Sequence, residues 1–238
     1  VETSAHLYEF DSVHGRAVGT VTHGEDWMDV GSGKIHMSRE RDPANIPHAA
    51  HGVDIVLECS GKFNSREASV AHFAAGAKKV LVSAPCKNAD QTIVFGVNDS
   101  LLTADADVVS NASCTTNCLA PVAKVLADTV GIEAGYMTTI HAYTGDQPTL
   151  DSSHKDLRRA RAAAMSMIPT STGATKAVGE VLPQLQGRMS GSAIRVPTSN
   201  VSAVDLVITT CHDTSVEEVN KLLSDAANGP MKGILGIN

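Results

Sequence analysis

The sequence has no surplus of basic residues and no apolar run long enough to cross a membrane. Its 19 Lys and Arg residues are outnumbered by 26 Asp and Glu residues, and the formal net charge is −7. A surface that binds duplex nucleic acid needs the opposite sign. A membrane-spanning helix needs about 20 apolar residues, and residues 1–8 lack the basic and apolar regions of a secretory signal. We therefore expect a soluble, unexported protein that binds neither nucleic acid nor membranes.

Cysteine is scarce and irregularly spaced. The five cysteines stand at positions 59, 86, 114, 118 and 211. An odd set of this kind argues against the disulfide framework of a secreted domain. A structural zinc site usually takes its ligands from two close pairs, whereas only Cys114 and Cys118 are close together. The set predicts free thiols in a reducing cytoplasm and no metal site.

The glycine-rich turn G-x-G-x-x-G, which usually opens a dinucleotide-binding βαβ unit, is also missing. The only G-x-G is Gly31-Ser32-Gly33, which lies between two short alternating runs and predicts a hairpin turn. The sequence begins at Val1, without a methionine. Either the protein binds no dinucleotide, or this sequence starts after the fingerprint.

Short β-branched runs and a helical stretch alternate in the first half of the chain. Residues 53–58 and 80–83 are apolar runs of strand length, and residues 65–75 between them have helical character. Gly76 stands where a helix C-cap would, and residues 107–110 form another apolar run. The pattern predicts a βαβ unit whose parallel strands are buried on both faces.

The pattern changes at Cys114. A helix is expected over residues 115–130, and residues 201–207 alternate with the period of a half-exposed antiparallel strand. A capping box that starts at Thr214 or at Ser215 predicts a further helix. We therefore predict an α/β chain with a parallel-sheet domain over residues 1–113 and an α+β domain with a mostly antiparallel sheet over residues 114–238.

Cys114 is the leading candidate for chemistry. The segment S-N-A-S-C-T-T-N-C, residues 110–118, joins the end of a predicted strand to the start of a predicted helix. The unpaired N–H groups of a first helical turn lower the pKa of a thiol placed there. We expect Pro121 to distort the first turns of this helix and Cys118 to be the more inert thiol. A buried cysteine beside an ordinary helix cap is the competing interpretation.

His141 is the candidate base. It ends the alternating run 136–140, and the end of a strand is a favoured position for catalytic groups. A thiolate and an imidazolium within hydrogen-bond distance form an ion pair, and the imidazole can then move protons. The sequence has 10 histidines, so a structural or surface role is the alternative.

Several segments carry groups that suit an anionic substrate. Arginines occur in R-R-A-R from residue 158 and in R-V-P-T from residue 195, and the guanidinium fork matches phosphate oxygens. A solvated helix face would equally explain Arg158 and Arg161. Predicted helix starts supply hydroxyl and N–H donors for an anion. These donors are Ser113, Thr115 and the segment 171–174.

Five motifs together resemble phosphorylating glyceraldehyde-3-phosphate dehydrogenase. They are S-N-A-S-C-T-T-N-C-L-A-P, H-A-Y-T-G-D-Q, D-L-R-R-A-R-A-A-A, S-T-G-A and R-V-P-T, and the resemblance covers essentially the whole chain. It implies that residues 1–113 are the remainder of a Rossmann-type NAD-binding domain without its first βα unit. It also implies that residues 114–238 are the catalytic domain without its C-terminal part, and that the protein is a homotetramer.

The resemblance implies oxidation of glyceraldehyde 3-phosphate with NAD and inorganic phosphate to 1,3-bisphosphoglycerate. Cys114 resembles the thiol that attacks the aldehyde, and His141 resembles the residue that activates this thiol. The other matching positions are Ser113, Thr115, Thr172, Gly173 and Arg195 for inorganic phosphate and the reacting groups; Thr144, Asp146 and Arg195 for the substrate's phosphate, with Arg159 nearby; and Arg41 and Ser83 for the nucleotide.

Three features depart from the family pattern. The family's opening strand, glycine fingerprint and ribose-binding acidic residue have no counterpart, and the chain stops at Asn238, before the family's final strand and helix. We therefore expect a fragment that lacks the family's N-terminal and C-terminal segments. Residues 151–154, D-S-S-H, replace a leucine-proline pair of strictly NAD-using members, and their hydroxyls could accept a 2′-phosphate. NAD is the expected cofactor, and NADP is not excluded.

Three other functions compete with this interpretation. Erythrose-4-phosphate dehydrogenase shares the cysteine segment. It lacks the A-Y-T and T-G-A patterns, which are found here at residues 142–144 and 172–174. A papain-like cysteine protease has no use for paired phosphate sites. A non-enzymatic binding role of the same fold is left open by the sequence.

Overall fold

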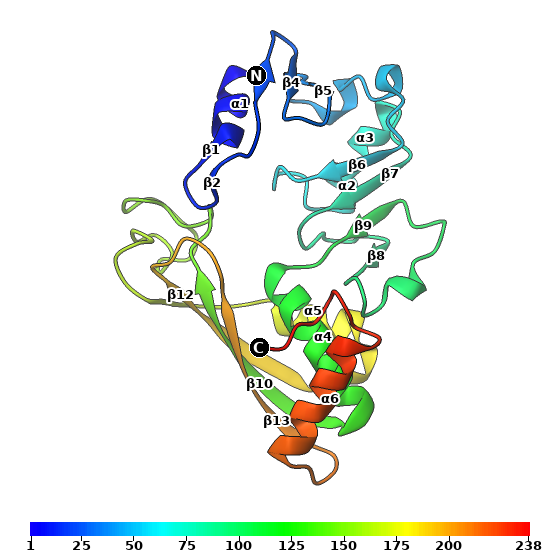
Figure 1. Ribbon diagram of the computed structural model, residues 1–238, viewed down its shortest axis with the longest axis vertical. Coiled ribbons are helices and arrows are strands. Elements are labelled where there is room, and N and C mark those ends of the chain that lie inside the picture. Colours follow the sequence, from blue (N-terminus) through cyan, green and yellow to red (C-terminus); the bar gives the residue numbers. More distant parts are fainter. The chain divides into compact units, whose positions relative to one another are not determined.

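Two four-stranded sheets, a three-stranded sheet and a two-stranded sheet make up the strands of the computed structural model, which describes all 238 residues (Figure 1). The chain forms two compact units. The first comprises Val1–Asp54 and Ala71–Ala77, and the second comprises Ile55–Val70 and Lys78–Asn238. None of the helices is both long enough and apolar enough to span a bilayer.

The first unit is built from short elements. Strands β4 (Trp27–Asp29) and β5 (Lys34–His36) pair antiparallel, and Gly31 and Gly33 between them have φ of 102° and 104°. The predicted hairpin turn is confirmed, because this left-handed backbone favours glycine. The remaining elements are α1 (Glu2–Glu9), β1 (Phe10–Asp11), β2 (Gly15–Arg16), β3 (Thr22–His23), α3 (Ala71–Ala74) and the 3-10 turns Pro43–Asn45 and Ala49–His51.

The second unit begins with a wholly parallel sheet. Its strand order is β6 (Ile55–Glu58), β7 (Lys79–Val82), β9 (Val108–Ser110) and β8 (Gln91–Thr92). Between β6 and β7, helix α2 (Arg66–Ser69) starts at Ser65, whose hydroxyl accepts the N–H of Ala68. The predicted βαβ unit is therefore confirmed, with its helical stretch divided between α2 and α3.

One expectation about this sheet is wrong. Val80, Val82 and Val108 are buried as predicted, but Ile55 and Leu57 on β6 are 59% and 64% exposed. These two residues are two positions apart and so lie on the same face of their strand. Because β6 is an edge strand with one neighbour, it is less enclosed than the central strands β7 and β9.

A second four-stranded sheet follows residue 113. Its order is β11 (Ile168–Thr170), β12 (Met189–Val196), β10 (Ile132–Ala142) and β13 (Ala203–Thr210). β10 and β12 run parallel, whereas β10–β13 and β11–β12 run antiparallel. The prediction of a mostly antiparallel sheet is confirmed, and exposure alternates along β13 as expected.

Three helices accompany this sheet: α4 (Cys114–Thr129), α5 (Ala174–Val181) and α6 (Val216–Asn228). The largest core cluster takes Leu119 and Leu126 from α4, Val178 from α5 and Met137 from β10. This cluster holds α4 and α5 against the sheet, so their first residues occupy fixed positions beside its strands.

The helix ends largely agree with the sequence pattern. α4 begins and ends within one residue of the predicted range, and it runs unbroken through Pro121. The cap of α6 is Ser215, which accepts the N–H of Glu218, while Thr214 instead donates to the Glu218 carboxylate.

We propose residues 113 and 114 as the boundary between the two domains, as the sequence pattern indicates. All strands of the parallel sheet precede this point, and all strands of the second sheet follow it. The division into compact units differs from this boundary, because the second unit contains residues 78–113 together with residues 114–238.

Replacement of Gly131 tests the packing of the turn that joins α4 to β10. Gly131 has φ of 71° after the end of α4, and a Cβ added there would lie 2.8 Å from Cβ of Cys211. We expect Gly131→Ala to lower the free energy of unfolding by about 2–4 kcal/mol, because left-handed strain and overpacking add together. The matched control is Gly187→Ala, with φ of 76° and no atom within 4 Å, which should lose only about 1–2 kcal/mol. Equal losses in urea unfolding would contradict the close contact with Cys211.

Candidate active site

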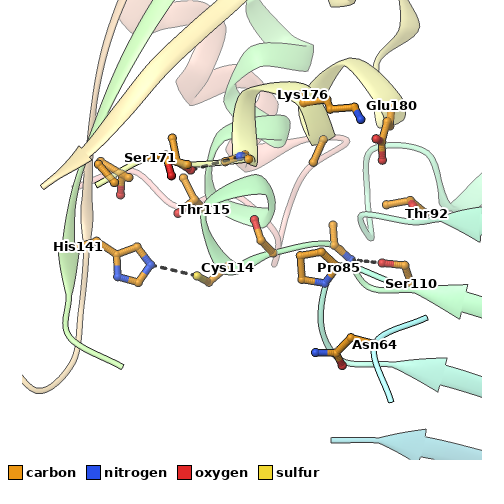
Figure 2. Close-up of a pocket in the computed structure, with 18 of the residues that line it drawn as sticks. Asn64, Pro85, Thr92, Ser110, Cys114, Thr115, His141, Ser171, Lys176 and Glu180 are labelled. Atoms are coloured by element: carbon orange, nitrogen blue, oxygen red, sulfur yellow. Dashed lines mark hydrogen bonds between the residues drawn. The ribbon is translucent and has the colours of Figure 1, made fainter. Parts of the chain in front are cut away.

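A cavity of about 480 Å³ lies within the second compact unit, where the start of α4 meets the end of β10 and the start of α5 (Figure 2). The parallel sheet contributes the segment after β7, and Asn64 lines the cavity near it. Eight of the residues predicted for the site line this cavity: Ser113, Cys114, Thr115, His141, Arg159, Thr172, Gly173 and Arg195.

Cys114 is the first residue of α4, and its side chain is exposed. The chain turns sharply before it, since the buried Ala112 has φ of 58°. The Cys114 Sγ lies 3.2 Å from Nε2 of His141, and Figure 2 shows the two side chains pointing toward one another. The structure thus brings together the thiol and the imidazole that the sequence predicts as nucleophile and base.

His141 is oriented by the backbone. It is 7% exposed near the end of β10, and its Nδ1 lies 2.6 Å from the carbonyl oxygen of Ala142. Nη1 of Arg195, which can only donate, lies farther from this Nδ1, at 3.0 Å. The shorter contact, to a carbonyl that can only accept, assigns a hydrogen to Nδ1, so Nε2 of the neutral ring presents a lone pair to Cys114. Burial lowers the pKa of His141, and the nearby positive charges of Arg195 and Arg159 lower it further. The ring is therefore disposed to be uncharged, and so able to accept a proton, at neutral pH.

Arg195 lies beside His141 because the two residues are paired in the parallel register of β10 and β12. Its Nη1 donates to the Ala142 carbonyl at 3.1 Å and lies 3.0 Å from Nδ1 of His141. Burial and the charge of Arg159 lower the pKa of Arg195, while the proximity of Cys114 opposes this shift. Arg195 thus places a half-buried positive charge beside the imidazole of His141.

Arg159 supplies a second cation. Its Nη1 donates to Oδ2 of Asp146 at 2.5 Å, and its Nη2 donates to the Ser171 carbonyl at 3.2 Å. The hydrogen bond from Arg159 is the main cause that lowers the pKa of Asp146. The Arg159 Nε also lies 3.6 Å from Oδ2 of Asp156. The cavity lining itself holds four cations, Lys87, Arg159, Lys176 and Arg195, and one carboxylate, Glu180, so it is positive and suits an anionic ligand.

Further donors surround the cavity at helix starts. Gly173 is the N-cap of α5 and makes no side-chain cap, while the Thr172 hydroxyl accepts the N–H of Ala174 at 3.2 Å. Ser113 caps α4, since its Oγ accepts the N–H of Thr116 at 3.1 Å and lies 2.7 Å from the Thr116 hydroxyl. The hydroxyl of Ser113 thus serves as an ordinary helix cap while it also lines the cavity.

Four predicted site residues do not line the cavity. Thr144 and Asp146 are exposed and reach it only through arginines, with the Thr144 hydroxyl 3.5 Å from Nη1 of Arg195. Ser83 is exposed after β7 and donates to the Glu58 carbonyl, and Arg41 is an exposed residue of the first unit. Nucleotide contact by Arg41 and Ser83 stays a prediction.

The sequence interpretation missed other lining residues. Thr139 is 1% exposed, lines the cavity, and has a buried hydroxyl without a hydrogen-bond partner in the protein. It lies two positions before His141 on β10, so the strand period could have identified it. Asn64, Lys176 and Glu180 also line the cavity, and only the tertiary structure brings them there.

Two further thiols differ from Cys114 in their surroundings. Burial raises the pKa of Cys118 and the neighbouring Cys114 raises it further; burial also raises the pKa of Cys86, which lines the cavity. Both groups are therefore poorer nucleophiles than an ordinary exposed thiol at neutral pH.

Comparison with known proteins gives matches along both parts of the chain. The family model for the glyceraldehyde 3-phosphate dehydrogenase C-terminal domain matches residues 113–238, and the model for the NAD binding domain of the same family matches residues 1–66. The glyceraldehyde-3-phosphate dehydrogenases of Cereibacter sphaeroides and Xanthobacter flavus are 65% and 64% identical over 236 residues, which are 99% of this chain and 70% of each relative. Glyceraldehyde-3-phosphate dehydrogenase 2 of Bacillus subtilis is 52% identical over 98% of this chain and 69% of its own length.

The geometry of the site predicts the order in which the thiols react. We expect iodoacetamide to alkylate Cys114 before the other four cysteines, because its thiol is exposed and faces an imidazole. Replacement of His141 by Asn should slow this alkylation at neutral pH, because the proton acceptor is lost. Peptide mapping by mass spectrometry gives the order. Fastest labelling at Cys59 or Cys211, or an unchanged rate in His141→Asn, would contradict the proposed pair.

Proposed function

Because the chain belongs to the glyceraldehyde-3-phosphate dehydrogenase family, we propose that it oxidises glyceraldehyde 3-phosphate to 1,3-bisphosphoglycerate, with NAD as the oxidant and inorganic phosphate as the second substrate. The observation that carries this proposal is the 3.2 Å contact between Cys114 and His141 beside two arginines in one cavity. A thiol–imidazole pair serves covalent catalysis, and the arginines suit phosphate groups.

In the first step the Cys114 thiol passes its proton to Nε2 of the neutral His141, and the thiolate so formed attacks the aldehyde carbon. A carbon–sulfur bond forms, the carbonyl oxygen takes a proton from the His141 imidazolium, and a thiohemiacetal results. The neutral imidazole then faces the new hydroxyl group and can remove its proton. The lowered pKa of His141 suits this return to the neutral form.

The second step makes a thioester. Loss of the carbon-bound hydrogen as hydride oxidises the thiohemiacetal, and His141 takes the hydroxyl proton. The nicotinamide of NAD, when bound, supplies the hydride acceptor. An oxygen of inorganic phosphate then attacks the thioester carbon, the carbon–sulfur bond breaks, and the Cys114 thiolate leaves. Arg195 lines the same cavity as Cys114 and supplies positive charge toward that leaving thiolate.

The cavity has features that fit a nicotinamide next to Cys114. Dinucleotides bind outside the carboxyl ends of parallel strands, and the segments after β7 and β9 border this cavity. Figure 2 shows Asn64 and Pro85 on the parallel-sheet side of Cys114, away from His141. The Asn64 Oδ1 is buried without a partner in the protein and offers an acceptor to a carboxamide. Arg41 and Ser83 are the positions proposed for the rest of the nucleotide.

The two cations suggest how the phosphates are bound. Arg195 lies next to His141, whereas Arg159 is held by Asp146 in the loop between β10 and β11. We assign both to phosphate recognition, with Thr115, Thr172 and Gly173 as additional donors. Thr144 and Asp146 support the arginines in this scheme rather than bind phosphate themselves.

A homotetramer and a cytoplasmic location also belong to the proposal. The loop between β10 and β11 exposes Leu150, Leu157, Met165 and Met167, and apolar exposure of this extent is typical of an interface between subunits. All five cysteines are free in the structure, which fits a reducing compartment.

A steady-state assay tests the proposed reaction on the complete protein, together with any residues that flank 1–238. Formation of NADH from glyceraldehyde 3-phosphate should require inorganic phosphate and should be abolished by Cys114→Ser, because the hydroxyl is a much weaker nucleophile. His141→Asn should reduce turnover by roughly 10²-fold or more. Faster turnover of erythrose 4-phosphate would favour the sister enzyme, and turnover without phosphate would contradict the acyl-phosphate step.

Arg195 provides a separate prediction. We expect Arg195→Lys to raise the KM for phosphate or for the triose phosphate, because an ammonium cannot bind as a two-pronged fork. The matched control is Arg188→Lys, since the Arg188 Nη1 donates to the Ile132 carbonyl and does not line the cavity. KM values near those of the wild type in Arg195→Lys would remove Arg195 from the anion site.

A further inference from the structure

A chain of hydrogen bonds in the loop between β10 and β11 leads from a histidine to the cavity. The N–H of Asp156 donates to Nδ1 of His154 at 2.9 Å, and Nε2 of His154 lies 3.3 Å from Oδ1 of Asp146. Oδ2 of the same carboxylate accepts from Arg159 at 2.5 Å. Arg159 also donates to the carbonyl of Ser171, next to the donors Thr172 and Gly173.

The tautomer of His154 follows from these contacts. Nδ1 of His154 lies 2.9 Å from the backbone N of Asp156, which can only donate, and 3.2 Å from the Asp156 carbonyl oxygen, which can only accept. The shorter contact assigns Nδ1 as an acceptor, and the ring then carries a hydrogen on Nε2, which faces Oδ1 of Asp146. The His154 side chain is only 15% exposed, so its ring is held by its surroundings and cannot turn freely.

This arrangement divides the Asp146 carboxylate between two donors. One oxygen accepts from His154 and the other accepts from Arg159, so these two hydrogen bonds together fix the orientation of the carboxylate. Asp146 itself is exposed, and without His154 its side chain would be free to adopt other rotamers. Arg159, which lines the cavity, would then lose its closer carboxylate partner and keep only the longer ion pair of its Nε with Oδ2 of Asp156, at 3.6 Å.

We propose that His154 is a positioning residue, which orients Asp146 and thereby holds Arg159 at the anion-binding end of the cavity. The inference rests on the proposed function, since it assigns the residue that prepares this site for a phosphate group. Binding of phosphate depends on His154, whereas the reactivity of Cys114 depends on it far less: the contact between Cys114 and His141 involves no residue of this loop, and the charge of Arg159 is the smallest influence on the pKa of His141.

Protection of Cys114 by inorganic phosphate provides a test that needs no catalytic turnover. The rate of alkylation by iodoacetamide is measured against phosphate concentration, at constant ionic strength, for the wild type and for variants of His154. His154→Phe keeps a ring and removes both hydrogen bonds. We expect the phosphate concentration for half-protection to rise about tenfold, the effect of one lost hydrogen bond to a charged group. The alkylation rate without phosphate should stay within about twofold of the wild type.

Matched variants separate positioning from a general effect on the loop. His154→Gln can restore a donor toward Asp146 and should recover part of the protection, whereas His154→Asn is too short to reach it and should behave like His154→Phe. Lys155→Ala, at an exposed neighbouring residue, should resemble the wild type. In steady state, His154→Asn should raise the KM for phosphorylated substrates more than it lowers kcat.

Arg159→Lys completes the test as a double-mutant cycle. If His154 acts through Arg159, the double variant His154→Asn with Arg159→Lys should need no more phosphate for half-protection than Arg159→Lys alone. Additive effects would overturn the proposal. So would unchanged half-protection in both His154→Phe and His154→Asn, or a large loss of alkylation rate without phosphate. A wild type that phosphate does not protect would overturn the proposed function as well.

Discussion

The contact between Cys114 Sγ and His141 Nε2 is the constraint on which the rest of the site depends. Its two partners come from different secondary structures: the first residue of α4 and a residue near the end of β10. A core cluster shared by α4, α5 and β10 fixes the start of α4 and the end of β10. The left-handed turn at Ala112 brings the chain from β9 into α4, so that the thiol begins the helix and faces the imidazole. Packing in this cluster therefore sets the distance across which a proton moves.

Charge is distributed unevenly between the whole protein and the site. The chain carries a formal charge of −7, yet four cations line the cavity, Lys87, Arg159, Lys176 and Arg195, against one lining carboxylate, Glu180. The excess of positive charge has two consequences with one cause. It adds to burial in lowering the pKa of His141, and it attracts anionic substrates. A carboxylate moved into contact with Arg195 would oppose both.

Secondary structure was largely predictable because it depends on neighbouring residues. The βαβ unit, the hairpin at Gly31–Gly33, helix α4 and the cap at Ser215 all agree with local patterns. The exposure of Ile55 and Leu57 was not predictable, because an apolar strand has the same pattern at the centre of a sheet and at its edge. Thr144 and Asp146 similarly stand close to His141 in sequence, but they support the cavity without lining it.

The sequence by itself determined which residue types are available for chemistry: a thiol at a helix start, a histidine at a strand end and arginines in two motifs. A helix start or a strand end is recognised from a few neighbouring residues, and each family motif is likewise a short run of neighbours along the chain. Only the tertiary structure decided which of them meet. The register that sets Arg195 beside His141, the burial that lowers the pKa of His141, and the contact from His154 through Asp146 to Arg159 all join segments separated along the chain. Such contacts arise from packing and strand pairing, whose energies depend on distances in space and not on positions in sequence.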